Sequence, residues 1–132
     1  MERDKRNLII GILVTLGISS LLSLIPVWQL IFLAGLVGGI INRKILYGAL
    51  SGAIGVGIFW ILYIIDGVFY KGLYNLFDIF GALIIGSGMG WIILLLIILL
   101  GFIFGFLGGS LGSSGGNLLL YYYNKQSSSE RK

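Results

Sequence analysis

Long uncharged apolar runs separated by short polar or charged breaks dominate the hydrophobic pattern of this chain. A transmembrane helix needs roughly 20 mostly apolar residues. Four stretches come near that length, over residues 8–25, 27–41, 45–65 and 91–111. Pro26 ends the first stretch because proline cannot continue a helical hydrogen-bond ladder, and Asp66 ends the third. The pattern therefore predicts an all-α integral membrane bundle of four transmembrane helices.

The stretch between the third and fourth predicted helices is the hardest to place. It holds Lys71 and Asp78 among Phe and Tyr residues, a composition typical of a segment at the membrane–water interface. We therefore expect an interfacial linker there. From Ile79 to Asn124 the chain then carries no charge. The alternative to one helix in this region is two, over residues 79–99 and 102–122, which gives five helices in all.

The positions of Lys and Arg distinguish these two topologies. With four spans, eight of the nine basic residues lie on one face of the membrane and only Lys71 lies on the other, whereas five spans give a split of five to four. The positive-inside rule favours four spans, with Arg43 and Lys44 in a cytoplasmic loop. Residues 1–7 then form a cytoplasmic N-terminus, 8–124 the transmembrane domain and 125–132 a disordered cytoplasmic tail. We expect a multi-pass protein of the plasma membrane.

Composition supports a membrane location and excludes several kinds of chemistry. Hydrophobic residues make up 58% of the chain and charged residues 11%, with a mean hydropathy of +1.04, whereas soluble domains carry about 25% charge. A net charge of +4 could indicate nucleic-acid binding, but the chain has no soluble basic domain that could bind it. We therefore expect the lipid bilayer as a partner and no nucleic acid.

Candidate chemistry is sparse. With no Cys and no His, the chain lacks thiolates, haem ligands and the usual zinc ligands. No ionisable residue falls well inside a predicted span, and we find no nucleophile beside a base. We therefore expect no catalytic residue, no metal, no cofactor and no enzymatic activity.

Glycine is concentrated in the apolar runs, and its spacing predicts close helix contacts. The chain has 22 glycines. In lipid, helices associate through close packing, which small residues four positions apart allow. The glycines with this spacing that we expect to pack helices are Gly35, Gly39, Gly48, Gly52, Gly101, Gly105, Gly108, Gly109 and Gly112. They either join the helices of one chain, or the double row in the last helix faces outward to another subunit. A water-filled path lined by glycine is a third interpretation.

Aromatic and amide residues mark the expected ends of helices. Trp and Tyr settle at membrane interfaces, so we expect interface anchors at Trp28, Trp91, Tyr121, Tyr122 and Tyr123. Asn42, just before the charged pair Arg43 and Lys44, indicates a helix end. Asn117, after two glycines, indicates where the final helix breaks or emerges.

Two segments carry a resemblance to a known family. The stretch "LAGLVGGIINRKILYGALSGAIG" and the later "GFIFGFLGGSLGSSGG" resemble an archaeal family of small four-helix membrane proteins classed as a domain of unknown function. The shared features are a first helix ending near a proline, a glycine-rich helix, a short charged loop and a G-A-L-S-G element. The resemblance implies an archaeal-type plasma membrane protein without an assigned activity or substrate.

Two classes of function remain open. The first is a non-enzymatic accessory or assembly subunit that packs through its glycine rows, as a homo-oligomer or with another membrane subunit. The second is a small oligomeric channel or transporter for a small solute or ion. The lack of a buried charge favours the first, because intramembrane ionisable residues usually mark ion and substrate pathways.

Overall fold

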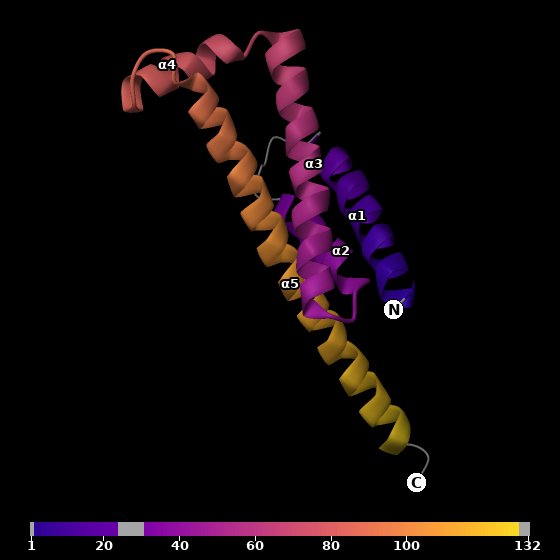
Figure 1. The fold of residues 1–132 in the computed structure, drawn as a ribbon. Coiled ribbons are helices and arrows are strands. Elements are labelled where there is room, and N and C mark those ends of the chain that lie inside the picture. The colour runs from indigo at the N-terminus through magenta and orange to yellow at the C-terminus, as the bar shows by residue number, and fades with distance from the viewer. Residues whose placement is uncertain (1, 24–30, 130–132) are drawn as a thin grey trace.

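Five helices make up the computed structural model, which describes residues 2–23 and 31–129. They are α1 (Glu2–Leu22), α2 (Ile31–Ile40), α3 (Ile45–Lys71), α4 (Tyr74–Ile84) and α5 (Gly90–Ser129) (Figure 1). Neither of the two described ranges contains a strand. The all-α prediction is confirmed.

The helices α1, α2, α3 and α5 form a bundle, and α4 lies across its far end. α5 packs most extensively on α3 and also on α2, while α1 packs on α3 and α2. α4 crosses between the far ends of α3 and α5, away from the start of α1 (Figure 1). The start of α1, the α2–α3 connection and the later turns of α5 all lie toward the opposite end.

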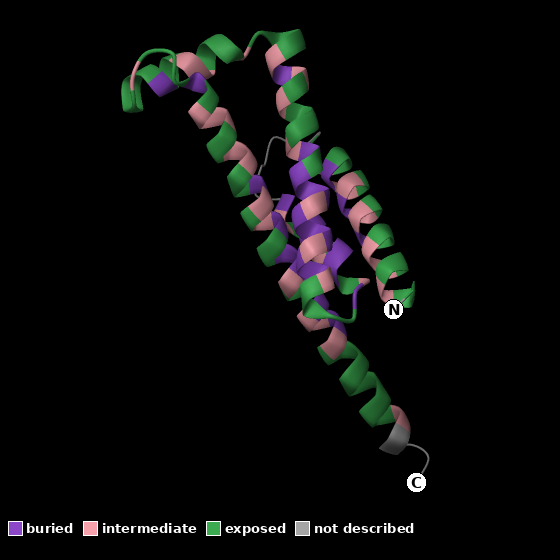
Figure 2. Ribbon diagram, viewed as in Figure 1, coloured by how far each residue is buried: buried purple, intermediate pink, exposed green. Residues whose placement is uncertain are grey.

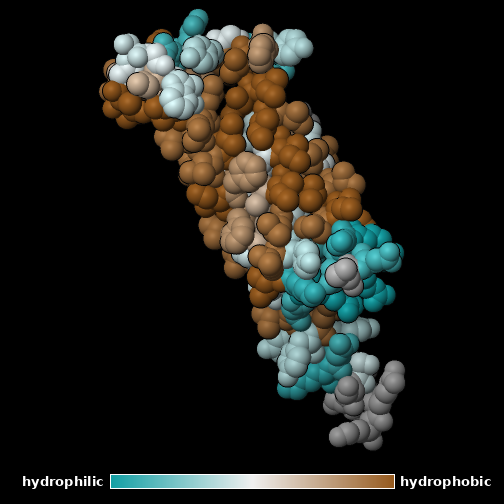
Figure 3. Space-filling view, viewed as in Figure 1, coloured by the Kyte–Doolittle hydropathy of each residue, from teal (hydrophilic) through white to brown (hydrophobic). Residues whose placement is uncertain are grey.

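Three helices, α1, α3 and α5, are long and apolar enough to cross a membrane. Hydrophobic residues form a continuous band over the middle of the molecule, and hydrophilic residues gather near its two ends (Figure 3). The length and apolar composition of these three helices confirm the prediction of a multi-pass membrane protein.

The second predicted span, over residues 27–41, differs most from the structure. Within the described part of the chain it is the 10-residue helix α2, whose length of about 15 Å is half the hydrocarbon thickness of a bilayer. Residues 27–30 lie outside the described ranges. The Asn42 N–H bonds the Gly39 carbonyl at 2.9 Å, in a tight turn that ends the helix. So short a helix depends on packing, and α2 contacts α1, α3 and α5.

The last predicted span lies inside one long helix. α5 runs for 40 residues without a break, so the alternative of two helices over 79–99 and 102–122 is wrong. The expectation of a helix break at Asn117 is also wrong, since that residue lies within α5. The helix continues through Ser129, where the sequence predicts a disordered tail from residue 125.

The linker between α3 and α5 contains a helix and two turns. α3 runs to Lys71, past the expected end near Asp66, and Gly72 follows with a φ of 64°. Glycine adopts this left-handed conformation without steric cost, and the Leu73 N–H then bonds the Gly67 carbonyl at 3.1 Å. The chain thereby turns into α4.

The buried residues of this protein are small, and its large apolar side chains point outward. The purple positions of Figure 2 gather where α3 meets its neighbours. Ala34, Ala49, Ala53 and Val56 are buried, whereas many Leu, Ile and Phe side chains are exposed. A surface of this kind suits lipid rather than water.

Candidate functional site

The first glycine row of α5 lies directly against α3. A Cβ atom on Gly105 would collide with the carbonyl oxygen of Gly52, and a Cβ on Gly109 would collide with that of Gly48. The reverse also holds, since a Cβ on Gly52 would meet the Gly105 carbonyl. At Gly101 the added atom would run into the indole ring of Trp60. The two backbones are therefore in direct contact at Gly105 and Gly109, whereas the Trp60 ring lies between them at Gly101.

The second row of α5 lies against α2. Cβ atoms on Gly108 and Gly112 would meet the carbonyl oxygens of Phe32 and Leu36. From the other side, Gly35 and Gly39 face the backbone of Gly105 and Gly109, with 3.0 Å from a Cβ on Gly35 to the Gly105 oxygen. Of the interpretations left open by the sequence, the one in which the double row faces outward to another subunit is therefore wrong. Because α5 sits in the groove between α2 and α3, both rows are covered within the chain.

α1 joins the bundle through a small-residue row that the sequence analysis did not identify. Gly11, Thr15 and Ser19 are buried at intervals of four residues. A Cβ on Gly38 of α2 would collide with the Thr15 hydroxyl, and a Cβ on Gly55 of α3 would come within 2.6 Å of the Thr15 Cβ. The row mixes glycine with hydroxyl residues, so a search for glycine pairs does not find it.

A buried polar cluster ties the four bundle helices together at the basic end. The Asn42 Nδ2 donates to the Ser51 hydroxyl at 3.1 Å and to the Gly38 carbonyl at 3.3 Å, and the Ser51 hydroxyl donates to the Gly48 carbonyl at 2.9 Å. A Cβ on Gly11 of α1 would lie 2.7 Å from the same Nδ2. Asn42 has a relative exposure of 2% and Ser51 of 0%. The cluster is therefore close-packed, although the Asn42 Oδ1 has no hydrogen-bond partner among the described residues.

α5 completes the cluster by bonding the carbonyl groups that follow α2. The Ser113 hydroxyl donates to the Asn42 carbonyl at 2.6 Å, and the Asn117 Nδ2 donates to the Arg43 carbonyl at 2.7 Å. Both acceptors belong to the connection after α2, outside any helix, so no helical hydrogen bond satisfies them and a side chain of α5 does so instead. Ser113 and Asn117 are four residues apart, which is one helical turn. This spacing is the only feature of the sequence that indicates that both side chains could bond the same segment.

The expected topology residues lie at the same end of the molecule as the start of α1. The Lys44 Nζ pairs with the Asp4 Oδ2 at 2.6 Å. The hydrogen bond and charge of Asp4 raise the pKa of Lys44 above its ordinary value. The pair is solvent-accessible and adds little stability. It does place residues 2–6 next to the Arg43–Lys44 loop.

At the opposite end, Asp66 near the end of α3 and Asp78 in α4 have separate partners. Asp66 pairs with Lys71 at 2.9 Å, while the Asp78 Oδ1 accepts a hydrogen bond from the Gly90 N–H at 3.2 Å. Asp78 therefore caps the first turn of α5 from a different helix, a role that the sequence analysis did not predict. The described residues contain no cluster of three acidic, His or Cys side chains for a metal ion.

The structure describes four of the five expected interface anchors. Trp91 is 54% exposed in the first turn of α5. Tyr121, Tyr122 and Tyr123 are between 63% and 72% exposed, on the part of α5 that continues past the bundle (Figure 1). Trp28 lies outside the described residues.

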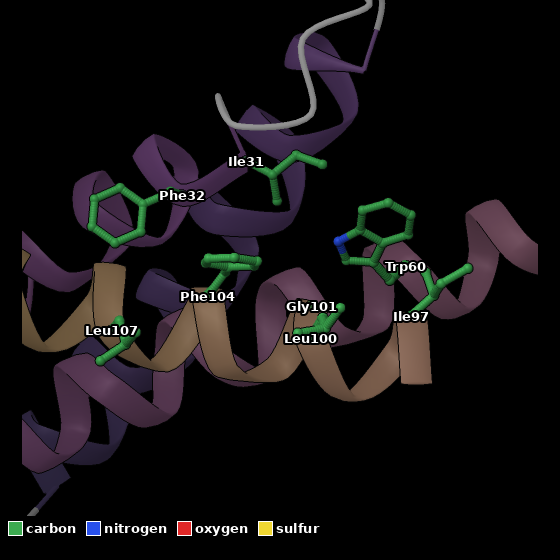
Figure 4. A pocket seen from close by; sticks show the side chains of 8 residues that line it. All are labelled: Ile31, Phe32, Trp60, Ile97, Leu100, Gly101, Phe104 and Leu107. Carbon is green, nitrogen blue, oxygen red and sulfur yellow. The ribbon is translucent and has the colours of Figure 1, made fainter. Parts of the chain in front are cut away.

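An apolar pocket opens between α2, α3 and α5, with a volume of about 530 Å³. Ile31 and Phe32 of α2 form one side, Trp60 of α3 closes one end, and α5 forms the floor from Ile97 to Leu107 (Figure 4). The Trp60 ring extends from α3 toward the space beside α5 (Figure 4). Its indole N–H is the only polar side-chain group among the described lining residues.

Comparison with known proteins identifies no relative of this chain. No family of known proteins, no curated protein and no solved structure matches the chain.

Proposed function

We propose that this protein is a non-enzymatic accessory or assembly subunit of a membrane. The observation that carries this proposal is the division between the covered and uncovered surfaces of the chain. The glycine rows pack the bundle internally, while α4 and the adjoining ends of α3 and α5 keep broad apolar faces uncovered. Leu83 is 78% exposed, Phe69 79% and Tyr70 84%. A partner would dock on those faces, rather than on the glycine rows as the sequence suggests.

The distribution of polar groups supports this proposal over a channel or transporter. From Ile45 to Ile65, α3 carries no Asp, Glu, Lys or Arg, and the same holds for α2 and for α5 up to Asn124. Of the four buried hydroxyls among the described residues, those of Thr15, Ser51 and Ser113 are bonded to backbone carbonyls, and only that of Ser19 has no partner. Groups satisfied in this way offer little to a passing ion. The channel or transporter stays the alternative.

We further propose that both termini and the Arg43–Lys44 loop are cytoplasmic and that the membrane is the plasma membrane. The Asp4–Lys44 pair and the Asn117–Arg43 bond gather three basic segments at one end of the bundle. The positive-inside rule orients such an end toward the cytoplasm. Membership of the archaeal family also remains a proposal, supported by the two glycine-rich motifs.

Site-specific photocrosslinking in native membranes tests the proposed role. Benzoylphenylalanine at Leu83 on α4 is expected to give one discrete crosslinked protein. The same group at Leu13 on α1, which is 65% exposed, serves as the control and should give none. If Leu83 crosslinks no protein, the assembly proposal fails. Purified protein in vesicles should also pass no more ions than protein-free vesicles do, and a clear flux would favour the alternative.

A further inference from the structure

We propose that the pocket between α2, α3 and α5 binds one hydrocarbon chain of a membrane lipid. This site is separate from the proposed subunit role and does not depend on it. The inference rests on the depth, shape, rim and chemistry of the pocket.

The depth of the pocket places it in the hydrocarbon region. Trp60 follows the charged Lys44 by 16 residues of α3 and precedes Asp66 by six. At about 1.5 Å per residue it lies roughly 24 Å from the basic end and 9 Å from Asp66. With a hydrocarbon core about 30 Å thick, Trp60 lies inside the core on the α4 side of its middle, and the rest of the pocket extends from there toward the basic end. The surrounding medium there is lipid chain.

The shape of the pocket suits a chain that runs along the helices. Its floor extends along α5 from Ile97 to Leu107, which corresponds to about 15 Å along the helix axis. Lipid chains run in the same general direction as the helices. A volume of about 530 Å³ is far larger than one apolar side chain of a partner could fill, and it falls in the usual range for small ligands, about 300–1,000 Å³.

The rim of the pocket disfavours a second helix. Helices in membranes approach closely where small residues form the contact surface. Here Leu100 and Leu107 are 49% and 47% exposed, so bulky side chains hold a neighbouring backbone away. The small residue of the floor, Gly101, is already covered by the Trp60 ring. A flexible chain can pass between such side chains, whereas a rigid helix cannot.

The chemistry of the lining selects an apolar occupant. Water inside a protein needs about two to four polar partners, and the lining offers one indole N–H. The pocket is also continuous with an apolar surface on α5, where Leu96, Leu99 and Ile103 are exposed. The lipid that covers this surface can therefore send a chain into the pocket.

Trp60 provides a direct readout for this proposal. The chain contains three tryptophans, so replacing Trp28 and Trp91 with Phe leaves Trp60 as the only indole. The probe is phosphatidylcholine with a dibrominated acyl chain, titrated into the protein in detergent micelles, because bromine quenches indole fluorescence on contact. We expect quenching that saturates at one lipid per protein.

Two matched variants test whether the pocket is the site. Ile97→Phe adds bulk inside the pocket, while Leu96→Phe adds the same bulk at an exposed neighbour that does not line it. We expect Ile97→Phe to raise the half-saturating lipid concentration about tenfold, a change of 1.4 kcal/mol, and Leu96→Phe to leave it unchanged. If Ile97→Phe does not fold, Leu107→Phe takes its place.

Four results would overturn the proposal. Quenching that rises without saturation would indicate ordinary contact with bulk lipid, as would equal effects of the two variants. A dimer on a sizing column that Ile97→Phe converts to monomer would assign the pocket to a second copy of the chain. Benzoylphenylalanine at Leu100 should capture lipid in native membranes, and capture of a protein instead would assign the pocket to a partner subunit.

Discussion

At the scale of single residues, Gly109 shows how the absence of a side chain sets the distance between helices. A Cβ atom there would collide with the Gly48 carbonyl and come within 3.2 Å of the Ala49 Cα. Both neighbours are backbone atoms and cannot rotate away. The helices must then separate, which loosens the contacts of the neighbouring Gly105 and Gly112 as well.

The first prediction compares Gly109→Ala with Gly115→Ala. Gly109→Ala should lower the free energy of unfolding by about 1–3 kcal/mol, the usual cost of overpacking. Gly115 lies in the same helix with nothing within 4 Å of its added Cβ, so Gly115→Ala should be neutral or gain up to about 1 kcal/mol of helix propensity. Thermal unfolding of the purified protein in detergent measures both. Equal melting temperatures for the two variants would contradict the α3–α5 contact.

The second prediction concerns the hydroxyl of Ser113. Ser113→Ala removes the donor to the Asn42 carbonyl and leaves that oxygen buried without its partner, at a cost of about 1–3 kcal/mol. Ser110 is the matched control, because its exposed hydroxyl bonds the Leu107 carbonyl of its own helix. Ser110→Ala should change the melting temperature little. A Ser113→Ala protein as stable as Ser110→Ala would show that the bond does not stabilise the bundle.

At the scale of helices, the sequence predicts the positions of the elements better than their pairings. Charge marks the start of the span predicted over residues 45–65, because a charge inside a span is costly and α3 begins directly after Lys44, although it continues past Asp66 to Lys71. The span predicted over residues 91–111 falls inside α5, which continues to Ser129 with no charge or proline to mark an end at residue 111. The same reasoning overestimates α2, since apolar composition does not tell a full span from a short helix held by three neighbours. An amide beside glycines also suggests that the helix breaks or emerges at Asn117, and of these two interpretations the break is wrong because α5 continues through that residue. The side chain of Asn117 bonds the carbonyl of Arg43, which lies 74 positions earlier and so cannot be recognised from the local sequence.

Residue spacing within one helix likewise predicts a contact but not its partner. The intervals of four between Gly101, Gly105 and Gly109 indicate a smooth stripe. Whether that stripe meets the same chain or a second one depends on the tertiary arrangement, which places α5 between α2 and α3. For the same reason the pocket beside Trp60 has no local signal, since its lining comes from three helices.

The third prediction addresses how α4 is joined to α5. Asp78→Ala removes the acceptor for the Gly90 N–H and should cost about 1 kcal/mol, as does the loss of a helix N-cap. Asn caps nearly as well as Asp, so Asp78→Asn should keep most of this stability. Limited proteolysis between Ile85 and Met89 should be faster in the Ala variant only. Similar cleavage of the two variants would argue against the cap.

At the scale of the whole molecule, the gathering of basic segments at one end predicts a defined orientation. Single cysteines at Gln126 and Lys71, in a chain without native Cys, should react with a membrane-impermeant thiol reagent from opposite sides. The residue at 71 should react in intact cells, and the residue at 126 only after the membrane is opened. Labelling of both from one side would exclude the proposed topology.

The length of α5 has a further consequence for the bilayer. Forty residues correspond to about 60 Å, twice the hydrocarbon thickness. Leu118, Leu119 and Leu120 lie beyond the Asn117–Arg43 contact and are 48% to 70% exposed. This hydrophobic mismatch should make a thick bilayer a better solvent for the protein than a thin one, because only the thick bilayer shelters these leucines. Trypsin cleavage after Lys125, compared in vesicles of short-chain and long-chain lipids, should be slower in the thicker membrane, and the protein would then sort toward thicker regions of the cell envelope.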